Sequence, residues 1–406
     1  MFTEKFFELI LDFEDCWKVD KIDVNSLRQE VDIFIKYIGV AGIDPNTNGL
    51  CPIYDHRESR RWRHLDVLQY KTFINCKIPR VTDQEGKVKT MRVPWADNGE
   101  RHTYLFECHT IDLLKATKNQ TKTSELLRVG FNVVNRIIHL SVVRGLERRP
   151  ADVAYEHLSI DEKSFKKGHH YITVVSSPIA GCVLDVSENR DSKACKEVLE
   201  RVVSKRHRDK VKTVSVDMWK PFLTTSQELF PMVNIVHDRF HLMKYLNDAV
   251  DKVRRREVKK HEELKNTKYV LLKNTANLTD KQFIKFQHIK DANYQVSKAW
   301  TVKENFRDLF GTQSSNEAFS LFMKWVIDST KTNIHEIAKV VDMFNNHLKG
   351  VCNALVETFS NAMAERLNGK IQEVKACGKG YRTFANFRSA ILFFNGGLSL
   401  YPQHSW

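Results

Sequence analysis

The chain has 406 residues and carries 64 Lys and Arg against 50 Asp and Glu, which gives a formal net charge of +14. Because 42% of its residues are hydrophobic, the chain can bury cores and is not a disordered polycation, and its length fits two to four domains. No apolar run reaches the roughly 18 to 20 residues that a membrane span needs, and the N-terminus lacks a secretory signal, so we expect neither a membrane protein nor a secreted one.

The positive charge favours a polyanionic partner, because Lys and Arg release condensed counterions when they neutralise phosphates. An ordinary basic cytosolic protein could carry the same charge. The charge therefore indicates nucleic acid as a binding partner but does not establish it. The eight cysteines are irregularly spaced and none lies in a Cys-x-x-Cys pair. We therefore expect free thiols in a reducing compartment rather than a disulfide framework or a Cys-rich zinc site.

Residues 1–100 are typical of a small mixed module. The alternating segments 70–78 and 87–93 predict two short strands joined by a turn at Asp83-Gln-Glu-Gly86. The stretch Arg57-Glu-Ser-Arg-Arg-Trp-Arg-His64 before them is basic and aromatic.

Residues 101–150 predict helices. After a first helix over 103–117, two further helices flank Gly130, and this pattern fits a helix-turn-helix. A small helical bundle without DNA-binding activity has the same pattern. On the last helix, the exposed side chains able to reach base edges or phosphates are Asn132, Asn135, Arg136 and His139.

An α/β sheet is predicted after the Arg-rich linker 144–150. Strands are expected at 157–162, 171–177, 181–186, 212–217 and 233–237, with an amphipathic helix at 193–205. The segment from Asp238 to about Gly350 reads as helical and basic, and helices over 357–374 and 381–394 follow it.

Three acids could form a metal site. Asp161 and Asp217 are expected at the ends of two strands that could lie side by side, and Glu365 lies on a later helix. Converging carboxylates can hold two Mg²⁺ ions, with Mn²⁺ as an alternative, for attack on a phosphodiester. Acids are also common at strand ends for local structural reasons, so the pattern alone leaves both interpretations open.

A competing pattern is His237-Asp-Arg-Phe-His241. Two histidines at i and i+4 on a helix imitate the H-E-x-x-H motif of zinc proteases, although no third ligand follows at a typical spacing. A role in supporting phosphate chemistry, or in packing at a helix start, is the alternative. Phosphate-binding loops, dinucleotide fingerprints and nucleophile elbows are absent from the sequence.

Taken in order, several stretches resemble the bacterial insertion-sequence transposases of the ISL-three type, which are DDE enzymes with an RNase H-like catalytic domain. The matching stretches are Arg61-Trp-Arg-His-Leu65, Val93-Pro-Trp-Ala96, Ile160-Asp-Glu-Lys-Ser-Phe165, Val216-Asp-Met-Trp-Lys-Pro-Phe222, Asp238-Arg-Phe-His241 and the segment from Asn361 to Arg388.

The resemblance implies an α/β fold with a mixed-sheet RNase H-like catalytic domain in two parts, 151–244 and 351–406, interrupted by an all-helical insertion at 245–350. A zinc-finger-like module at 1–100 and a helix-turn-helix at 101–150 would precede it. Asp161, Asp217 and Glu365 would be the catalytic and metal-binding acids. The expected DNA-binding residues are Arg61, Arg63, Asn132, Asn135, Arg136, His139, Arg239, His241, Lys370, Arg382 and Arg388.

The first module departs from the family pattern. Members usually carry a zinc finger with a Cys-Pro-x-Cys and a Cys-Pro-x-His, but Asp44-Pro-Asn-Thr47 and Thr82-Asp-Gln-Glu-Gly86 stand at those places, and Cys51 aligns with a cysteine that is not a ligand. Because carboxylates replace soft thiolate ligands poorly, we expect this module to fold without zinc.

The expected function is DNA transposition. The protein would bind the terminal inverted repeats of an insertion sequence, cleave DNA with Mg²⁺ and join the ends to target DNA, as a homodimer on DNA in the bacterial cytoplasm and nucleoid. The alternatives are a DNA-binding repressor or a domesticated, catalytically silent relative, which the loss of the zinc ligands favours. A junction or RNA/DNA hybrid nuclease on the same fold would leave the helix-turn-helix unexplained.

Overall fold

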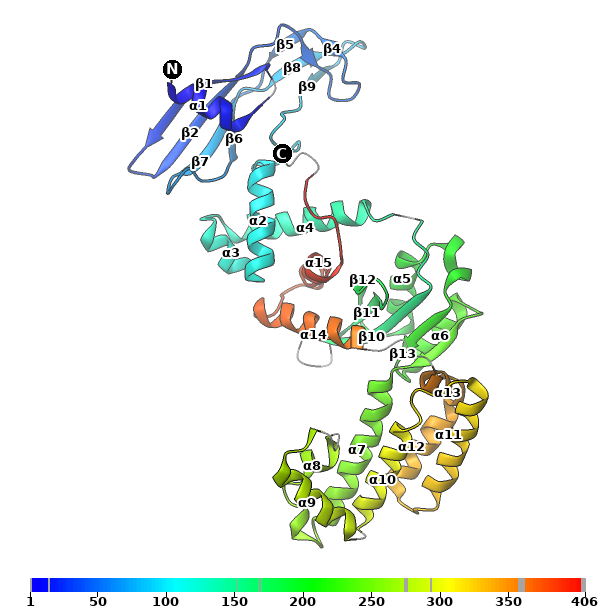
Figure 1. Cartoon of the computed structure of the whole chain (residues 1–406). Helices are drawn as coiled ribbons and strands as arrows, with labels where there is room; N and C mark the ends of the chain where they lie inside the picture. The colour runs from blue at the N-terminus through cyan, green and yellow to red at the C-terminus, as the bar shows by residue number, and fades with distance from the viewer. Residues whose placement is uncertain are drawn as a thin grey trace. The chain divides into compact units, whose positions relative to one another are not determined.

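The computed structural model describes residues 2–13, 15–150, 152–166, 168, 170–273, 277–292, 294–356 and 362–402, and for residues 2, 3, 362, 364 and 365 it describes the backbone alone. The chain forms two compact units (Figure 1). One comprises Met1–Arg149 together with Leu398–Trp406, and the other comprises Pro150–Gly397. Each unit is described by itself below.

A four-stranded sheet forms the larger part of the N-terminal module, in the order β1-β2-β7-β6. Its strands are β1 (Trp17–Asn25), β2 (Glu30–Tyr37), β7 (Lys71–Cys76) and β6 (Arg60–Arg63), and helix α1 (Phe2–Leu11) packs against β1. The strands β2 and β7 are parallel, and the other pairs are antiparallel. The indole rings of Trp17 and Trp62 both meet that of Trp95 edge to face, and these rings anchor the core.

The smaller part of this module contains β3 (Gly42–Ile43) paired with β4 (Leu50–Cys51), and a sheet of β5 (Ile53–His56), β8 (Pro79–Thr82) and β9 (Val88–Thr90). The turn at Asp83–Gly86 is predicted to join strands 70–78 and 87–93. The first of these two strands is wrong. The chain leaves the larger sheet after Cys76 and starts a new strand at Pro79, so the turn joins β8 to β9.

Three helices follow, as predicted: α2 (Tyr104–Thr117), α3 (Gln120–Leu126) and α4 (Phe131–Glu147). Side chains of Thr103 and Asn119 cap the first two helices, and Val134, Ile137 and Ile138 of α4 are buried. No single helix in the described part of the chain is long and apolar enough to cross a membrane; α3 and α4 reach that length and composition only together, across a 117° bend.

The end of the chain returns to α4. Arg144 donates to the carbonyl of Leu400 at 2.7 Å, and the backbone of Gly145 lies so close to Leu398 that a Cβ there would be 2.7 Å from the leucine Cβ. Residues 398–402 therefore belong to the first unit, although the range 351–406 predicted for the catalytic domain includes them.

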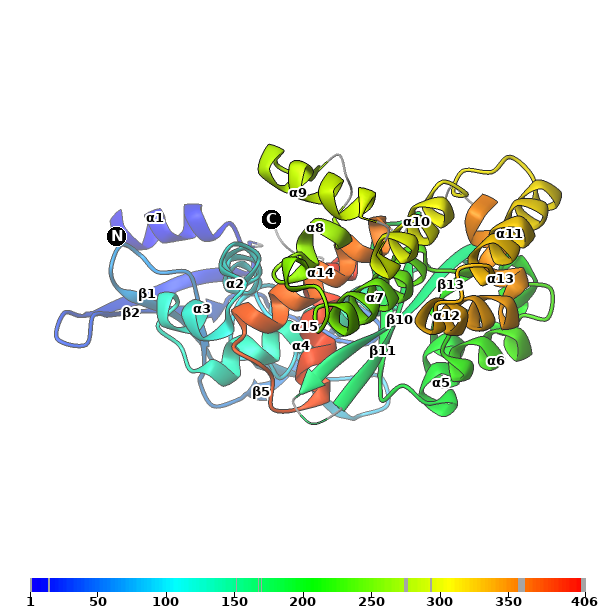
Figure 2. The same cartoon turned by 90° about the horizontal axis from the view of Figure 1, so that it is seen from below.

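The second unit is built on a five-stranded mixed sheet in the order β12-β11-β10-β13-β14. The strands are β10 (His157–Lys166), β11 (His170–Ser177), β12 (Cys182–Glu188), β13 (Thr213–Val216) and β14 (Asn234–His237). The first three are antiparallel, and β10, β13 and β14 run parallel. Helices α5 (Ser192–Val202) and α6 (Lys220–Leu229) pack side by side (Figure 2), and α5 covers β11 and β12. The predicted helix at 193–205 thus ends three residues early.

A helical bundle separates β14 from the last two helices. It contains α7 (Arg239–Glu257), α8 (Lys268–Leu272), α9 (Asp280–Asp291), α10 (Gln295–Arg307), α11 (Ser315–Thr330), α12 (His335–Asn346) and α13 (Leu348–Val356). The rings of Phe306, Trp325 and Phe344 pack together at its centre. The chain then forms α14 (Ala362–Cys377) and α15 (Phe384–Asn395), and α15 packs against β12. Residues 357–361, where the predicted helix 357–374 begins, lie outside the described residues.

We predict that His64 makes the first unit sensitive to acid. Burial first, and the neighbouring Arg63 second, lower the pKa of His64 to about 4, while its Nδ1 lies 2.9 Å from the Thr103 hydroxyl. The unfolded chain takes up this proton near pH 6.5 and the folded chain does not, so stability falls as the pH drops from about 6.5 to about 4, by roughly 3 kcal/mol.

Urea denaturation of the wild type and of His64→Gln at a series of pH values measures this effect. The carboxylates lose stability in both proteins as the pH falls, so the difference between the two isolates the histidine. Equal pH dependence in the two proteins would contradict the prediction.

Candidate active site

Asp161 on β10 and Asp217, the residue directly after β13, lie at equivalent positions of the parallel strand pairing. The β10–β13 pairing runs from His157 opposite Thr213 to Ile160 opposite Val216, and each aspartate is the next residue. The expectation that Asp161 ends its strand is wrong, because β10 continues to Lys166 in antiparallel pairing with β11. The two acids nevertheless meet at one edge of the parallel part of the sheet, the usual location of binding sites in such sheets.

The imidazole of His241 lies between the two carboxylates. Its Nε2 is 3.8 Å from Asp161 Oδ1 and its Nδ1 is 3.5 Å from Asp217 Oδ2. One turn further along α7, the hydroxyl of Tyr245 donates to Asp217 Oδ1 at 3.3 Å. Burial, and secondarily Asp217, raise the pKa of Tyr245 to about 12, so this hydroxyl stays protonated and can donate.

Lys163 and Asn368 meet the other oxygen of Asp161. The Lys163 ammonium is 3.0 Å from Asp161 Oδ2, and the amide of Asn368 donates to the same oxygen at 2.5 Å. Asn368 is on α14, three residues after Glu365, and residues three apart share one face of a helix. The contact therefore brings the helix that carries Glu365 to Asp161. The side chain of Glu365 lies outside the described residues.

Aromatic and charged side chains close in sequence to the two acids gather around Arg190. Arg190 pairs with Glu162 at 2.8 Å, and its guanidinium lies over the rings of Tyr171 and Trp219. The indole N–H of Trp219 donates to the Arg190 carbonyl at 3.0 Å, and the indole is 40% exposed two residues after Asp217. The ring is thus held in place while part of it faces solvent.

No group of three or more His, Cys, Asp or Glu side chains that could hold a metal ion occurs in the part of the chain that the structure describes. Asp161 and Asp217 supply two hard oxygen donors with side chains 13% and 23% exposed, a donor chemistry that suits Mg²⁺ or Mn²⁺. A third carboxylate would have to come from outside the described side chains.

The zinc-protease pattern at His237–His241 is wrong, because the two histidines do not share a helix. His237 ends β14, Asp238 caps α7, and the helix begins at Arg239. His237 is buried against His347 and the backbone of Gly350, with Nδ1 3.2 Å from the Val216 carbonyl. Burial lowers its pKa to about 4, so it is a neutral packing residue at the end of the parallel strands.

The predicted DNA-binding residues of the first unit differ in access. Arg63 is 7% exposed and donates to the carbonyls of His64 and Thr72, so it stabilises the module and is not available to a phosphate. Arg61 pairs with Glu30 and Asp32 and lies over Phe73. On α4, Asn132 and Arg136 are exposed and Asn135 and His139 are half-buried, and Arg136 pairs with Glu100 at 2.6 Å.

The predicted DNA-binding residues of the second unit also differ in how accessible their side chains are. Arg388 forms two hydrogen bonds with the buried carboxylate of Asp185, and Arg239 donates to the Ala354 carbonyl at 2.8 Å, so both tie elements of the fold together. Lys370 is half-buried and Arg382 is exposed. His241 is the predicted residue that the structure brings to the acids.

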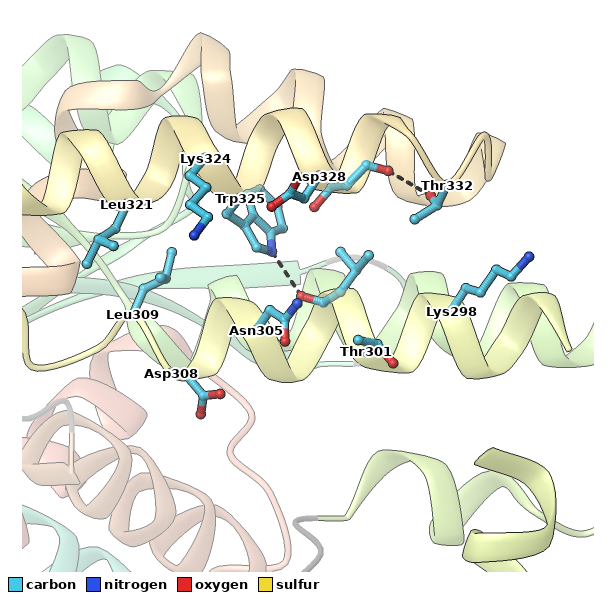
Figure 3. A pocket seen from close by; sticks show the side chains of 12 residues that line it. Lys298, Thr301, Asn305, Asp308, Leu309, Leu321, Lys324, Trp325, Asp328 and Thr332 are labelled. Carbon is cyan, nitrogen blue, oxygen red and sulfur yellow. Dashed lines mark hydrogen bonds between the residues drawn. The ribbon is translucent and has the colours of Figure 1, made fainter. Parts of the chain in front are cut away.

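A pocket of about 470 Å³ lies between α10 and α11 (Figure 3), with Leu309, Leu321 and Trp325 in its wall and Lys298 and Lys324 at its edge. Its lining, as far as the chain is described, includes none of the candidate catalytic acids. The pocket thus belongs to the helical bundle and not to the candidate site.

The sequence-based site did not include Lys163, Tyr245, Asn368, Arg190 or Trp219. A signal existed for two of them, because Lys163 and Trp219 each follow a candidate acid by two residues. Tyr245 follows His241 by one helical turn. The spacing of Asn368 from Glu365 was visible as well, but its contact with Asp161 depends on packing between segments 207 residues apart.

Comparisons with known proteins agree on one family. The family model for transposases of the ISL-three (ISL3) type, with a DDE domain, matches residues 158–391. The transposase for insertion sequence element IS1001 of Bordetella parapertussis is 23% identical over 332 residues, covering 80% of this chain and 81% of that protein. The transposase for IS1557 of Mycobacterium tuberculosis, from two strains, is 25% identical over 353 residues, covering 80% of this chain and 79% of that protein.

Proposed function

The chain belongs to the transposase family of the ISL-three type, and from this premise we propose that it binds the terminal inverted repeats of an insertion sequence and catalyses metal-dependent DNA cleavage and strand transfer. The observation that carries the proposal is the meeting of Asp161 and Asp217 around His241 at the edge of the parallel strands. The approach of α14 to Asp161 through Asn368 supports Glu365 as the third acid.

The proposed catalytic domain is RNase H-like, with parts at 151–244 and 351–397 and the helical insertion at 245–350. Its support is the sheet order, in which three antiparallel strands are followed by two parallel ones on the far side of β10. Asp161 would lie on the central strand and Asp217 after its parallel neighbour. A phosphodiester would bind where the two acids lie, at the end of the parallel pairing of β10 and β13.

Asp161, Asp217 and Glu365 would hold Mg²⁺ or Mn²⁺, which supply an activated water or 3′-hydroxyl and stabilise the leaving oxygen. The surrounding side chains would position the acids. Tyr245 holds one oxygen of Asp217, and Asn368 holds one oxygen of Asp161. Lys163 places a positive charge beside Asp161, where a non-bridging phosphate oxygen would lie.

Recognition of the inverted repeats is assigned to residues 1–148, with α3 and α4 as a helix-turn-helix. The 117° angle between the two helices and the turn at Gly130 support this assignment. Asn132, Asn135, Arg136 and His139 of α4 would face DNA. Cutting two ends together requires two chains, so the proposed working form is a homodimer on DNA.

We predict that Asp217→Asn abolishes cleavage without loss of DNA binding. The amide keeps the shape of the carboxylate but gives up its charge, so cleavage of a plasmid carrying the element's ends falls by about 10³-fold or more. Asp209→Asn is the matched control, because Asp209 is exposed and pairs only weakly with Lys210 at 3.8 Å in the same unit.

Cleavage at the wild-type rate by Asp217→Asn would contradict the metal-acid mechanism. Specific binding to the ends by the wild type, without cleavage under any divalent ion, would favour the repressor over the enzyme. The two results are distinguished in one experiment by following binding and nicking of the same plasmid.

We predict further that Asn135→Ala weakens binding to the element's ends by about ten-fold or more and leaves binding to unrelated DNA nearly unchanged, because a lost base contact removes specificity. Mobility shifts with both DNAs at fixed salt measure the two effects. Asn345→Ala, at an exposed position of α12, is the control. An equal loss with both DNAs would show that Asn135 does not read sequence.

A further inference from the structure

Two buried aspartates face one lysine in the smaller part of the N-terminal module. Asp44 is 3% exposed and Asp83 is 9% exposed. The Lys89 ammonium lies 3.5 Å from Asp44 Oδ2 and 2.7 Å from Asp83 Oδ2. A single cation therefore joins two carboxylates that are distant in sequence.

Each aspartate also begins a turn. Asp44 lies in the turn between β3 and β4, and its Oδ1 accepts the N–H of Asn46 at 2.7 Å. Asp83 lies in the turn between β8 and β9, and its Oδ1 accepts the N–H groups of Glu85 and Lys87 at 3.0 and 2.8 Å. In both turns one carboxylate oxygen organises the local backbone, and the other faces Lys89.

The elements that this cation joins are short. β3 and β4 have two residues each, and β9 has three. β3 approaches β8 so closely that a Cβ on Gly42 would lie 2.3 Å from the Val81 side chain, so glycine is required there. A part with so few ladder hydrogen bonds and so little core needs a cross-link to hold its turns together.

The family resemblance implies a zinc ion at this place, and the residues present do not fit one. Asp44 and Asp83 stand where the first cysteine of each pair would be, while Thr47 and Gly86 stand where the second ligands would be. The two carboxylates already meet an ammonium, and neither a thiolate nor an imidazole accompanies them among the described residues.

We propose that the Lys89 ammonium takes the place of the metal ion in this module and cross-links the two turns through Asp44 and Asp83. The hydrogen bonds support the charged forms: the Asn46 N–H and Lys89 lower the pKa of Asp44, Lys89 and the Lys87 N–H lower the pKa of Asp83, and Asp83 raises the pKa of Lys89. The inference concerns the folding of the module and stands independently of the proposed function.

Hydrogen exchange of the full-length chain, read on peptides that cover 42–51 and 79–91, tests the proposal. Lys89→Met keeps the length of the side chain and removes its charge, so two buried carboxylates lose their counter-ion. Exchange in both peptides is expected to rise at least about ten-fold, because each turn loses its link to the other. The control is Lys87→Met, whose ammonium pairs with the exposed Glu85 at 2.8 Å.

A triple variant separates the loss of the link from the cost of unpaired buried charges. The variant Lys89→Met/Asp44→Asn/Asp83→Asn replaces the cation and both carboxylates by neutral side chains. No buried charge is then left without a partner. Protection in both peptides is expected to recover only in part from its level in Lys89→Met, because the unpaired charges are gone but the turns still lack their link. This comparison remains informative if Lys89→Met alone fails to fold.

Three results would overturn the proposal. The first is one zinc per chain in the purified wild type, measured by mass spectrometry of metals, together with faster exchange after chelation. The second is exchange in Lys89→Met equal to that in Lys87→Met. The third is a triple variant as well protected as the wild type, which would mean that the turns hold without a link and that Lys89→Met only leaves buried charges without a partner.

Discussion

The parallel pairing of β13 between β10 and β14 is the constraint on which the candidate site depends. Because the two ladders end at Val216, the next residues of β10 and β13, Asp161 and Asp217, lie at the same level of the sheet. The same pairing ends β14 at His237, so α7 starts two residues later and its first turn carries His241 to both carboxylates. One register therefore positions three side chains from three segments.

The partners of the acids distinguish structural carboxylates from reactive ones. Asp185 is buried and meets both Arg201 and Arg388, so its charge serves to tie α5 and α15 to β12. Asp44 and Asp83 share the single ammonium of Lys89, and backbone N–H groups of their turns donate to the remaining oxygens. Asp161 and Asp217 are more exposed, and their neighbours are a lysine, an amide, a phenol and a shared imidazole. Asp185 meets two guanidiniums, whereas Asp161 and Asp217 together meet one ammonium and a shared imidazole, so less of their charge is compensated, as a cation-binding site requires.

Much of the second unit could be predicted from sequence, because runs of β-branched residues such as 212–217 have few other conformations open to them. The register of the strands could not be predicted from sequence, since it is set by packing between strands. For this reason the sequence predicts Asp161 at a strand end, although β10 continues to Lys166. The contact of Asn368 with Asp161 could not be predicted either, because a helical pattern does not indicate which polar side chain will face a strand 207 residues away. The burial of Arg63 could not be predicted either, since a basic pattern does not distinguish a buried arginine from an exposed one.

The most direct test of the central claim is the position of Mn²⁺ in crystals of the full-length chain, located by anomalous scattering. If Asp161 and Asp217 form the metal site together with Glu365, manganese will lie about 2 Å from carboxylate oxygens of both aspartates. Crystals of Asp217→Asn grown and soaked in the same way will lose that density. Manganese bound elsewhere, with none between the two aspartates at saturating concentration, would contradict the assignment.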